Sequence, residues 1–384
     1  MQRNPDRYSI VQQLAASLIT LATMMPTILQ PLLLGALLRE HRIDAVQLGQ
    51  AATAEQLGMA FTAFCAGAWL RPVNLRPILL ATLSLCAAAN LATSFLAGQQ
   101  IILARLVSGL ASGTAIWLII SMVARAEWPA RFMGLYVISQ SLIALLLSAM
   151  LSLVLLPALG ATGGFQAIAA FVMLAMVCLP IIPSRLSELP TSSHGWMPTA
   201  TGILGLIVVG LYMGAGLAIW IYVLPLAAAS GIAPTIANAT VSVGIAAQML
   251  GGLAAIYIRG LAAPKILVAC VAVELAASAT LTLTSVSPLF MGAGFLFCFG
   301  LTLGVSFLIP FLEVVDPSRR AGALCGSAQL LGQSFGAYCA SSVVARQGVH
   351  GAGYTGIALL VLVLTTVFIS ITLTTHRYRP RFSA

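Results

Sequence analysis

The chain has 384 residues, of which 60% are hydrophobic and only 7% are charged, and its formal net charge is +9. Soluble globular domains carry about 25% charged residues, so this composition excludes a soluble protein. The positive charge does not indicate nucleic-acid binding, because the basic residues lie in alternate loops and form no basic face.

Long apolar segments dominate the sequence, and a helix that crosses a bilayer needs about 20 such residues. The first segment, residues 10–38, is too long for the apolar part of a signal peptide, so we expect it to be the first membrane helix. The sequence therefore predicts an all-α integral membrane protein with twelve transmembrane helices. The predicted segments are 10–38, 50–70, 77–97, 100–124, 134–157, 163–183, 200–229, 234–258, 264–286, 288–312, 322–345 and 351–375.

An internal repeat divides these segments into two halves. Pro129, Arg131 and Gly134 recur 188 positions later as Pro317, Arg319 and Gly322. Ile78-Leu79 and Ile266-Leu267 show the same offset at another connection. The shared offset predicts two pseudo-symmetric six-helix bundles, residues 1–183 and 200–384, joined by a cytoplasmic linker at 184–199. Transporters often show such weak internal symmetry, with the substrate site between the halves.

The basic residues fix the expected orientation. If the N-terminus is cytoplasmic, the outer loops hold only Arg39, Arg42 and Arg346, and apart from Arg105 all other basic residues lie on the inner side. Because cytoplasmic loops carry an excess of Lys and Arg, we expect a multi-pass protein of the cytoplasmic (inner) membrane with both termini in the cytoplasm.

The cysteines indicate neither a disulfide framework nor a metal site. All seven lie in apolar segments without a C-x-x-C pair, where cysteine behaves as a small hydrophobic residue. We therefore expect no metal and no cofactor. The seven are Cys65, Cys86, Cys178, Cys270, Cys298, Cys325 and Cys339.

The fourth segment carries the most specific pattern, Arg105-x-x-x-Gly109-x-x-x-Gly113. Two glycines four residues apart give a helix a smooth groove into which a neighbouring backbone can pack. The pattern resembles the fourth-helix signature of the major facilitator superfamily of secondary transporters, whose twelve-helix layout fits the whole chain.

The resemblance also implies cytoplasmic gating loops, at Gly67, Arg71 and Arg76 in the first half and at Arg131 and Arg319 in the repeated P-x-R motif. Arg71 stands where the superfamily has an aspartate, so the conformational latch attributed to that aspartate is in doubt. The segment 134–157 lacks the G-P-x-x-G-G pattern of the antiporter branch, which argues against a drug/proton antiporter.

Glu55, Arg105 and Glu274 are the ionisable residues, other than cysteine and tyrosine, that lie inside the predicted membrane segments and away from their ends. We expect Arg105 to border a watery passage and to interact with Glu55 or a substrate carboxylate. A nearby positive charge favours an ionised carboxylate and burial disfavours it, so motion between the two environments could couple transport to protons. The alternatives are a fixed structural pair, or side chains that reach the outer surface. Glu274 is either protonated or turned inward to a partner, if the helix numbering is correct.

Polar residues on one face of the first segment include Thr27 and Gln30, and Pro26 and Pro31 predict a bend there. A face that lines a cavity explains both features, whereas packing of polar side chains between helices explains the threonines equally well.

The seventh segment is glycine-rich and then aromatic, which resembles the bent helix that closes over substrate in the superfamily. Tyr212 is a candidate cavity residue, whereas Trp220 and Tyr222 fit either that closure or a belt at the membrane interface. The remaining candidates are buried amides: Gln140, Gln329 and Gln333.

These features predict a monomeric, non-enzymatic secondary transporter. It would move a small anionic or neutral polar organic solute by alternating access, with proton coupling. The alternatives are efflux of drugs or metabolites by proton antiport, and a transporter-like sensor that does not transport. An ATP-driven pump is excluded by the single lysine, Lys265, which is followed by Ile266, so that no G-K-[ST] phosphate loop exists.

Overall fold

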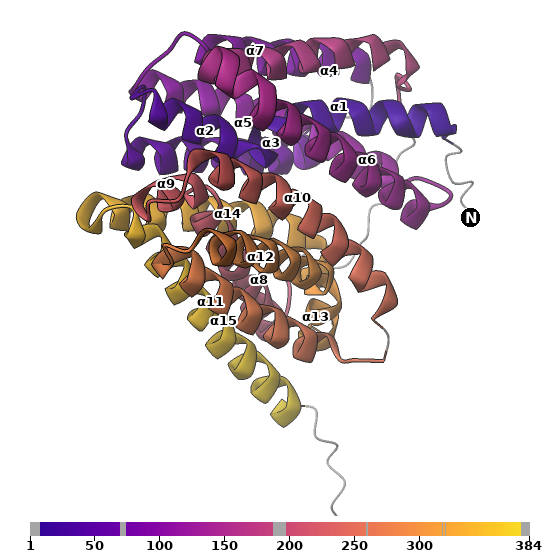
Figure 1. Ribbon diagram of the computed structural model, residues 1–384. Helices are drawn as coiled ribbons and strands as arrows, with labels where there is room; N and C mark the ends of the chain where they lie inside the picture. Colours follow the sequence, from indigo (N-terminus) through magenta and orange to yellow (C-terminus); the bar gives the residue numbers. More distant parts are fainter. Residues whose placement is uncertain are drawn as a thin grey trace, which may run out of the picture. The chain divides into compact units, whose positions relative to one another are not determined.

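The computed structural model describes residues 8–69, 74–186, 197–258, 260–316, 318 and 320–377. Every regular element in these residues is a helix. The chain forms two compact units, Met1–Ser193 and His194–Ala384 (Figure 1). The predicted linker, residues 184–199, includes residues 187–196, which lie outside the described part of the chain.

The first unit contains the helices from α1 to α7 and two short irregular helices, the π-helix η1 and the 3₁₀-helix η2. Their bounds are α1 Ile10–Ile28, α2 Gln30–Arg39, α3 Ala45–Trp69, α4 Leu75–Thr93, α5 Gln99–Val123, α6 Pro129–Met150, η1 Leu151–Leu155, α7 Leu156–Ala175 and η2 Met176–Ile181.

The second unit contains the helices from α8 to α15. Their bounds are α8 Ala200–Trp220, α9 Val223–Ala229, α10 Pro234–Tyr257, α11 Ala263–Leu283, α12 Ser287–Ser306, α13 Leu308–Val315, α14 Arg320–Gln347 and α15 His350–Arg377.

Twelve membrane crossings follow from these helices. In the described residues, nine helical stretches are long and apolar enough to cross a membrane, and one of them, Arg131–Ile181, covers two crossings. Polar residues lower the hydropathy of α3 and α14, which add the remaining two crossings to give twelve. The predicted all-α, twelve-helix fold is confirmed.

Three crossings are broken into two helices each. The first breaks at Leu29, between Pro26 and Pro31, where the backbone leaves the helical region. Proline removes a backbone donor and crowds the preceding turn, which explains the bend that the sequence predicts there. The seventh crossing breaks between α8 and α9, and the tenth breaks at Phe307, three residues before Pro310.

Two helix starts differ from the prediction by five residues. The α3 helix begins at Ala45 because the Asp44 carboxylate accepts hydrogen bonds from the backbone N–H of Val46 at 2.8 Å and of Gln47 at 2.7 Å. Glu55 therefore lies ten residues into its helix, not in its first turns. The fifth crossing begins at Pro129, and it meets the sixth at Gly160, whose φ of 62° favours glycine.

The predicted internal symmetry is visible in how the helices pair. In the first unit α3 packs on α5 and α4 packs on α7, and in the second unit α10 packs on α12 and α11 packs on α15. One hydrogen bond recurs at the offset of 188. Thr162 donates to the Ser94 carbonyl at 3.2 Å, and His350 Nδ1 contacts the Thr282 carbonyl at 3.0 Å.

Glycines allow α3 and α5 to pack backbone against backbone. A Cβ at Gly109 would collide with the Glu55 carbonyl, and a Cβ at Gly113 would collide with that of Met59. From the other side, a Cβ at Gly58 would lie 2.6 Å from the Leu106 carbonyl oxygen. This contact fixes the backbone of α3 at Glu55 against α5, four residues beyond Arg105.

Asp316 joins the adjoining ends of three helices in the second unit, α8, α13 and α14. Its carboxylate accepts hydrogen bonds from Thr199, just before α8, from Ser318, and from the Ala321 N–H in the first turn of α14. Burial alone would raise the pKa of Asp316, but these hydrogen bonds lower it to about 2.

We expect Gly109→Ala to destabilise the purified protein by about 1–3 kcal/mol, the usual cost of overpacking, because backbone rather than a flexible side chain opposes the added methyl. Thermal unfolding in detergent measures this effect. Gly134→Ala is the control, since nothing lies within 4 Å of its Cβ position. Equal melting temperatures for the two variants would contradict the close α3–α5 contact.

We expect Asp316→Asn to lower the unfolding free energy at pH 7 by about 2 kcal/mol, at about 1.36 kcal/mol per pKa unit. Because the folded-state pKa lies below the unfolded value, this stabilisation is present near neutral pH and is lost as pH falls from about 4 towards 2. Thermal unfolding from pH 7 to pH 3 should show the wild type converging on the variant. A difference in stability that stays constant across that range would show that the ionised carboxylate of Asp316 does not stabilise the protein.

Candidate functional site

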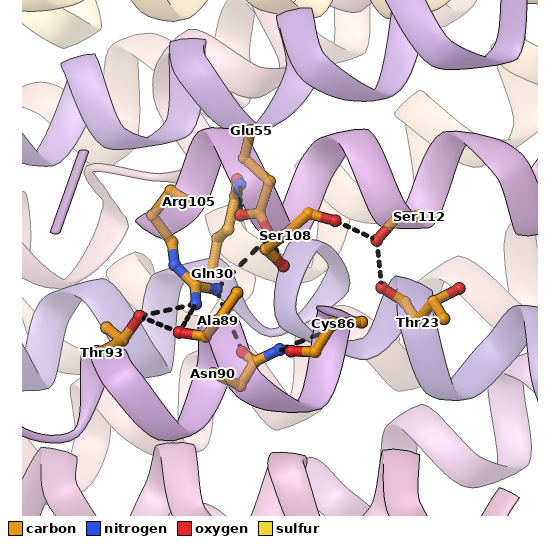
Figure 2. A network of polar contacts seen from close by, with 10 residues as sticks. All are labelled: Thr23, Gln30, Glu55, Cys86, Ala89, Asn90, Thr93, Arg105, Ser108 and Ser112. Atoms are coloured by element: carbon orange, nitrogen blue, oxygen red, sulfur yellow. Dashed lines mark hydrogen bonds and ion pairs between the residues drawn. The ribbon is translucent and has the colours of Figure 1, made fainter. Parts of the chain in front are cut away.

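A buried ion pair lies inside the first unit. Arg105 of α5 is 1% exposed and Glu55 of α3 is 0% exposed, and Nη1 of the guanidinium lies 3.5 Å from Oε1 of the carboxylate (Figure 2). At that distance the two charges attract each other without forming a short hydrogen bond. The hypothesis that both side chains reach the outer surface is wrong.

Arg105 is held more closely by α4 than by its charge partner. Its guanidinium donates to Asn90 Oδ1 at 3.1 Å, to Thr93 Oγ1 at 2.8 Å and to the Ala89 carbonyl at 3.4 Å. The guanidinium carbon lies 4.9 Å from the centroid of the Phe165 ring of α7, a cation–π distance. Arg105 is therefore enclosed by side chains of its own unit and, in this conformation, does not border the watery passage that the sequence suggests.

Glu55 acts only as an acceptor. Its Oε2 accepts from the Gln30 amide at 2.8 Å, and its Oε1 accepts from the Ser108 hydroxyl at 3.1 Å. An ionised carboxylate accepts on both oxygens, and the guanidinium compensates its charge. The site thus carries one positive and one negative charge and no net charge.

The same network ties α1 to α5. Ser112, one turn after Ser108, donates to the Thr23 carbonyl at 2.7 Å (Figure 2). Thr20 donates to the Ala115 carbonyl at 3.2 Å, and Thr20 and Thr23 are fully buried. For these two threonines the structure favours packing between helices over the lining of a cavity.

Two buried polar atoms at the site have no hydrogen-bond partner within the described part of the chain: Arg105 Nε and Gln30 Oε1. Buried polar groups are nearly always paired, and unpaired ones mark strained or functional positions. A charge pair at 3.5 Å with spare donors and acceptors can exchange partners with little motion.

A second buried carboxyl lies in the second unit. Glu274 of α11 is 0% exposed, and its Oε1 accepts a hydrogen bond from the hydroxyl of Tyr212 in α8, which is also fully buried. The structure therefore turns Glu274 inward to a partner, one of the alternatives that the sequence leaves open.

Four other polar candidates take no part in the hydrogen bonds described for the two carboxyl groups: Thr27, Gln140, Gln329 and Gln333. Gln329 donates to the Cys325 sulfur at 3.5 Å, and Thr27, Gln140 and Gln333 are half-buried. Within the described residues, no hydrogen bond joins any of them to Arg105, Glu55 or Glu274. Trp220 and Tyr222 are 7% and 0% exposed, so neither belongs to an interfacial belt.

The predicted gating residues are only partly described. Arg76 donates to the Ile182 carbonyl at 2.9 Å, which ties the start of α4 to the end of η2. Arg131 is exposed in the first turn of α6, and Gly67 lies near the end of α3. Arg71 and Arg319 lie outside the described residues.

The sequence analysis missed the neutral residues around the pair. Asn90 and Thr93 are three residues apart, as are Arg105 and Ser108, so each couple shares one face of its helix. That spacing is a usable signal, although it does not say which faces meet. Phe165 carries no such signal.

Comparisons with known proteins rest on structure alone, because no protein-family model and no curated protein matches the sequence. The chain is similar to the nucleoside transporter NupG, with a TM-score of 0.69 at 13% identity over 94% of this chain and 98% of the other. A variant of NupG gives 0.71 at 12% identity, over 94% of this chain and 99% of that one.

The chain is also similar to a bacterial homologue of the human lysosomal transporter Spinster, solved in an inward-facing, unoccupied conformation. The TM-score is 0.67 at 12% identity, over 97% of this chain and 98% of the other. At these identities the likeness shows the fold. The expected major facilitator fold is confirmed, and it extends over nearly the full length of each chain.

Neutralising either member of the ion pair alone should destabilise the protein. We expect Glu55→Gln and Arg105→Gln each to cost about 3–5 kcal/mol, because each leaves an uncompensated buried charge. The double variant should cost much less than the sum of the two. Thermal unfolding of all four proteins in detergent closes this cycle, and additive losses would mean that the two charges do not interact.

Proposed function

We infer that the protein is a multi-pass membrane protein that moves a small molecule, rather than an enzyme, because solved proteins of the same fold are transporters. We propose that the protein is a secondary active transporter of the major facilitator superfamily, coupled to protons, in the cytoplasmic membrane. Residues 1–183 and 200–384 would act as the two moving bundles and 184–199 as their linker, in a monomer with both termini cytoplasmic.

The observation that carries this proposal is the charged network around Arg105 inside a membrane bundle. A charged side chain at the centre of a membrane helix costs about 2.5–3.5 kcal/mol on insertion scales, and intramembrane charges usually mark substrate or ion pathways. A purely structural bundle would gain from apolar replacements, since buried ion pairs are often no more stable than well-packed hydrophobic residues.

The charge balance of the site favours a neutral polar solute over an anion. Glu55 already compensates Arg105, and Gln30 and Asn90 contribute uncharged amides. An anion would have to displace Glu55 from the guanidinium, whereas a neutral solute with several hydroxyl or ring-nitrogen groups leaves the pair intact. One protein of the same fold is a nucleoside transporter, so nucleosides are the first class of solute to test.

Transport itself is tested in proteoliposomes with an imposed pH gradient. We expect accumulation of a labelled neutral solute, with nucleosides first, that collapses when a protonophore abolishes the gradient. Accumulation driven by the opposite gradient would identify antiport efflux instead. Solute binding in a thermal-shift screen without any flux would identify a transporter-like sensor.

The double variant Glu55→Gln with Arg105→Gln separates a functional pair from a structural one. It carries no uncompensated charge, so it should fold, and we expect its uptake to fall at least tenfold. Gly134→Ala serves as the matched control for expression and insertion. Wild-type uptake by the folded double variant would show that the pair only holds the bundle together.

A further inference from the structure

The second unit contains a buried carboxyl group whose surroundings differ from those of Glu55. Glu274 lies eleven residues into α11, half-way along the helix, and is fully buried. Its Oε1 accepts from the Tyr212 hydroxyl, and its Oε2 is buried without a hydrogen-bond partner among the described residues. One oxygen of this carboxyl is therefore held and the other is free to carry a proton.

Among the side chains that the structure describes, no cation faces Glu274, and Lys265 at the start of α11 is exposed. Tyr212 approaches from α8 and Cys298 from α12, and Cys270 lies one turn away on α11 itself. The other helices packed on α11 are α9, α13 and α15. The α9 helix has no titratable side chain. Glu313 of α13 and Tyr354 of α15 are exposed, and His350 of α15 contacts the Thr282 carbonyl instead.

The internal repeat shows that the second unit has no residue equivalent to Arg105. The position 188 residues after Arg105 is Ala293, and the position 188 after Glu55 is Val243. Glu274 itself corresponds to Cys86 of the first unit. The second bundle has therefore placed a carboxyl group where the first has a thiol, without the guanidinium that compensates Glu55.

The surroundings of Tyr212 provide its hydroxyl with alternative acceptors. The hydroxyl lies 3.1 Å from the Gly300 carbonyl and 3.2 Å from the Leu301 carbonyl, both in α12. A Cβ at Gly304 would collide with this hydroxyl, so the glycine makes the room that it occupies. Tyr212 can thus donate to Glu274 or to the backbone of α12 by a small rotation.

We propose that Glu274 is the proton-binding site of the transporter, with Tyr212 as its positioning residue. In this conformation the carboxyl group is neutral, because an ionised carboxylate buried without a cation costs several kcal/mol. Proton release follows when water reaches the group. The proton passes from Oε2 to water, and the Tyr212 hydroxyl then donates to the carboxylate that remains.

This inference deepens the proposed function and rests on its proton coupling. Glu55 is unsuited to the role in this conformation, since protonating it would leave Arg105 as an uncompensated buried charge. The two carboxyl groups thus divide the work, with Glu55 ionised against Arg105 and Glu274 exchanging the proton.

Infrared spectroscopy of the purified protein tests the proton site without any transport assay. We expect a carbonyl-stretch band of a protonated carboxyl group at neutral pH that is absent in Glu274→Gln. In Tyr212→Phe the band should persist and move to higher frequency, because the carbonyl loses a hydrogen bond. The control is Glu313→Gln, an exposed carboxyl on α13, which should keep the wild-type band. A wild type without the band, or a band that survives in Glu274→Gln, would overturn the assignment.

Proteoliposomes then test whether the site serves coupling. The ratio of pH-driven accumulation to solute exchange should fall to the passive level in Glu274→Gln and stay at the wild-type value in Glu313→Gln. A band in the wild type without any pH-driven accumulation would refute the proposed coupling while leaving the proton site in place. Unchanged coupling in Glu274→Gln, or Na⁺ abolishing the band, would overturn the role of Glu274 as proton carrier.

Discussion

Compensation of charge inside a membrane is the constraint on which the rest of the molecule depends. The bilayer supplies neither water nor counter-ions, so a guanidinium in α5 requires a carboxylate from another helix. Glycines allow the helix that carries this carboxylate to come close enough. Gly109 and Gly58 let α3 approach α5 backbone to backbone, and this approach brings Glu55 within 3.5 Å of Arg105. Further polar side chains from α2, α4 and α5 then surround the two charges.

The two bundles share an architecture and differ in their chemistry. The same helix pairs meet in each, and the hydrogen bond from Thr162 to the Ser94 carbonyl has its counterpart between His350 and Thr282. Yet the first bundle holds a charge pair without net charge, and the second holds a lone carboxyl group bonded to a tyrosine. Such a division suits a transporter in which one bundle keeps a fixed internal polar site and the other exchanges a proton.

Much of the fold could be predicted from the sequence, because the length of an apolar run and the position of a proline act locally. The twelve crossings and the bend between Pro26 and Pro31 follow from such signals. The start of α3 could have been predicted too, from the capping pattern of Asp44 and Gln47.

The candidate site was only partly predictable. Charged residues stand out in an apolar segment, so Arg105, Glu55 and Glu274 were found, whereas Asn90 and Thr93 resemble any polar residues that pack between helices. The inward turn of Glu274 depends on the rotation of α11 about its axis, which a uniformly apolar helix does not encode in its periodicity.

The charge states of the two buried carboxyl groups decide whether this division of labour is correct. Carboxyl-carbon NMR of the glutamate-labelled protein at neutral pH, assigned with single Glu→Gln variants, measures both in one sample. An ionised Glu55 together with a protonated Glu274 is the predicted result. A protonated Glu55, or an ionised Glu274, would contradict the claim that charge is compensated in the first bundle and absent from the second.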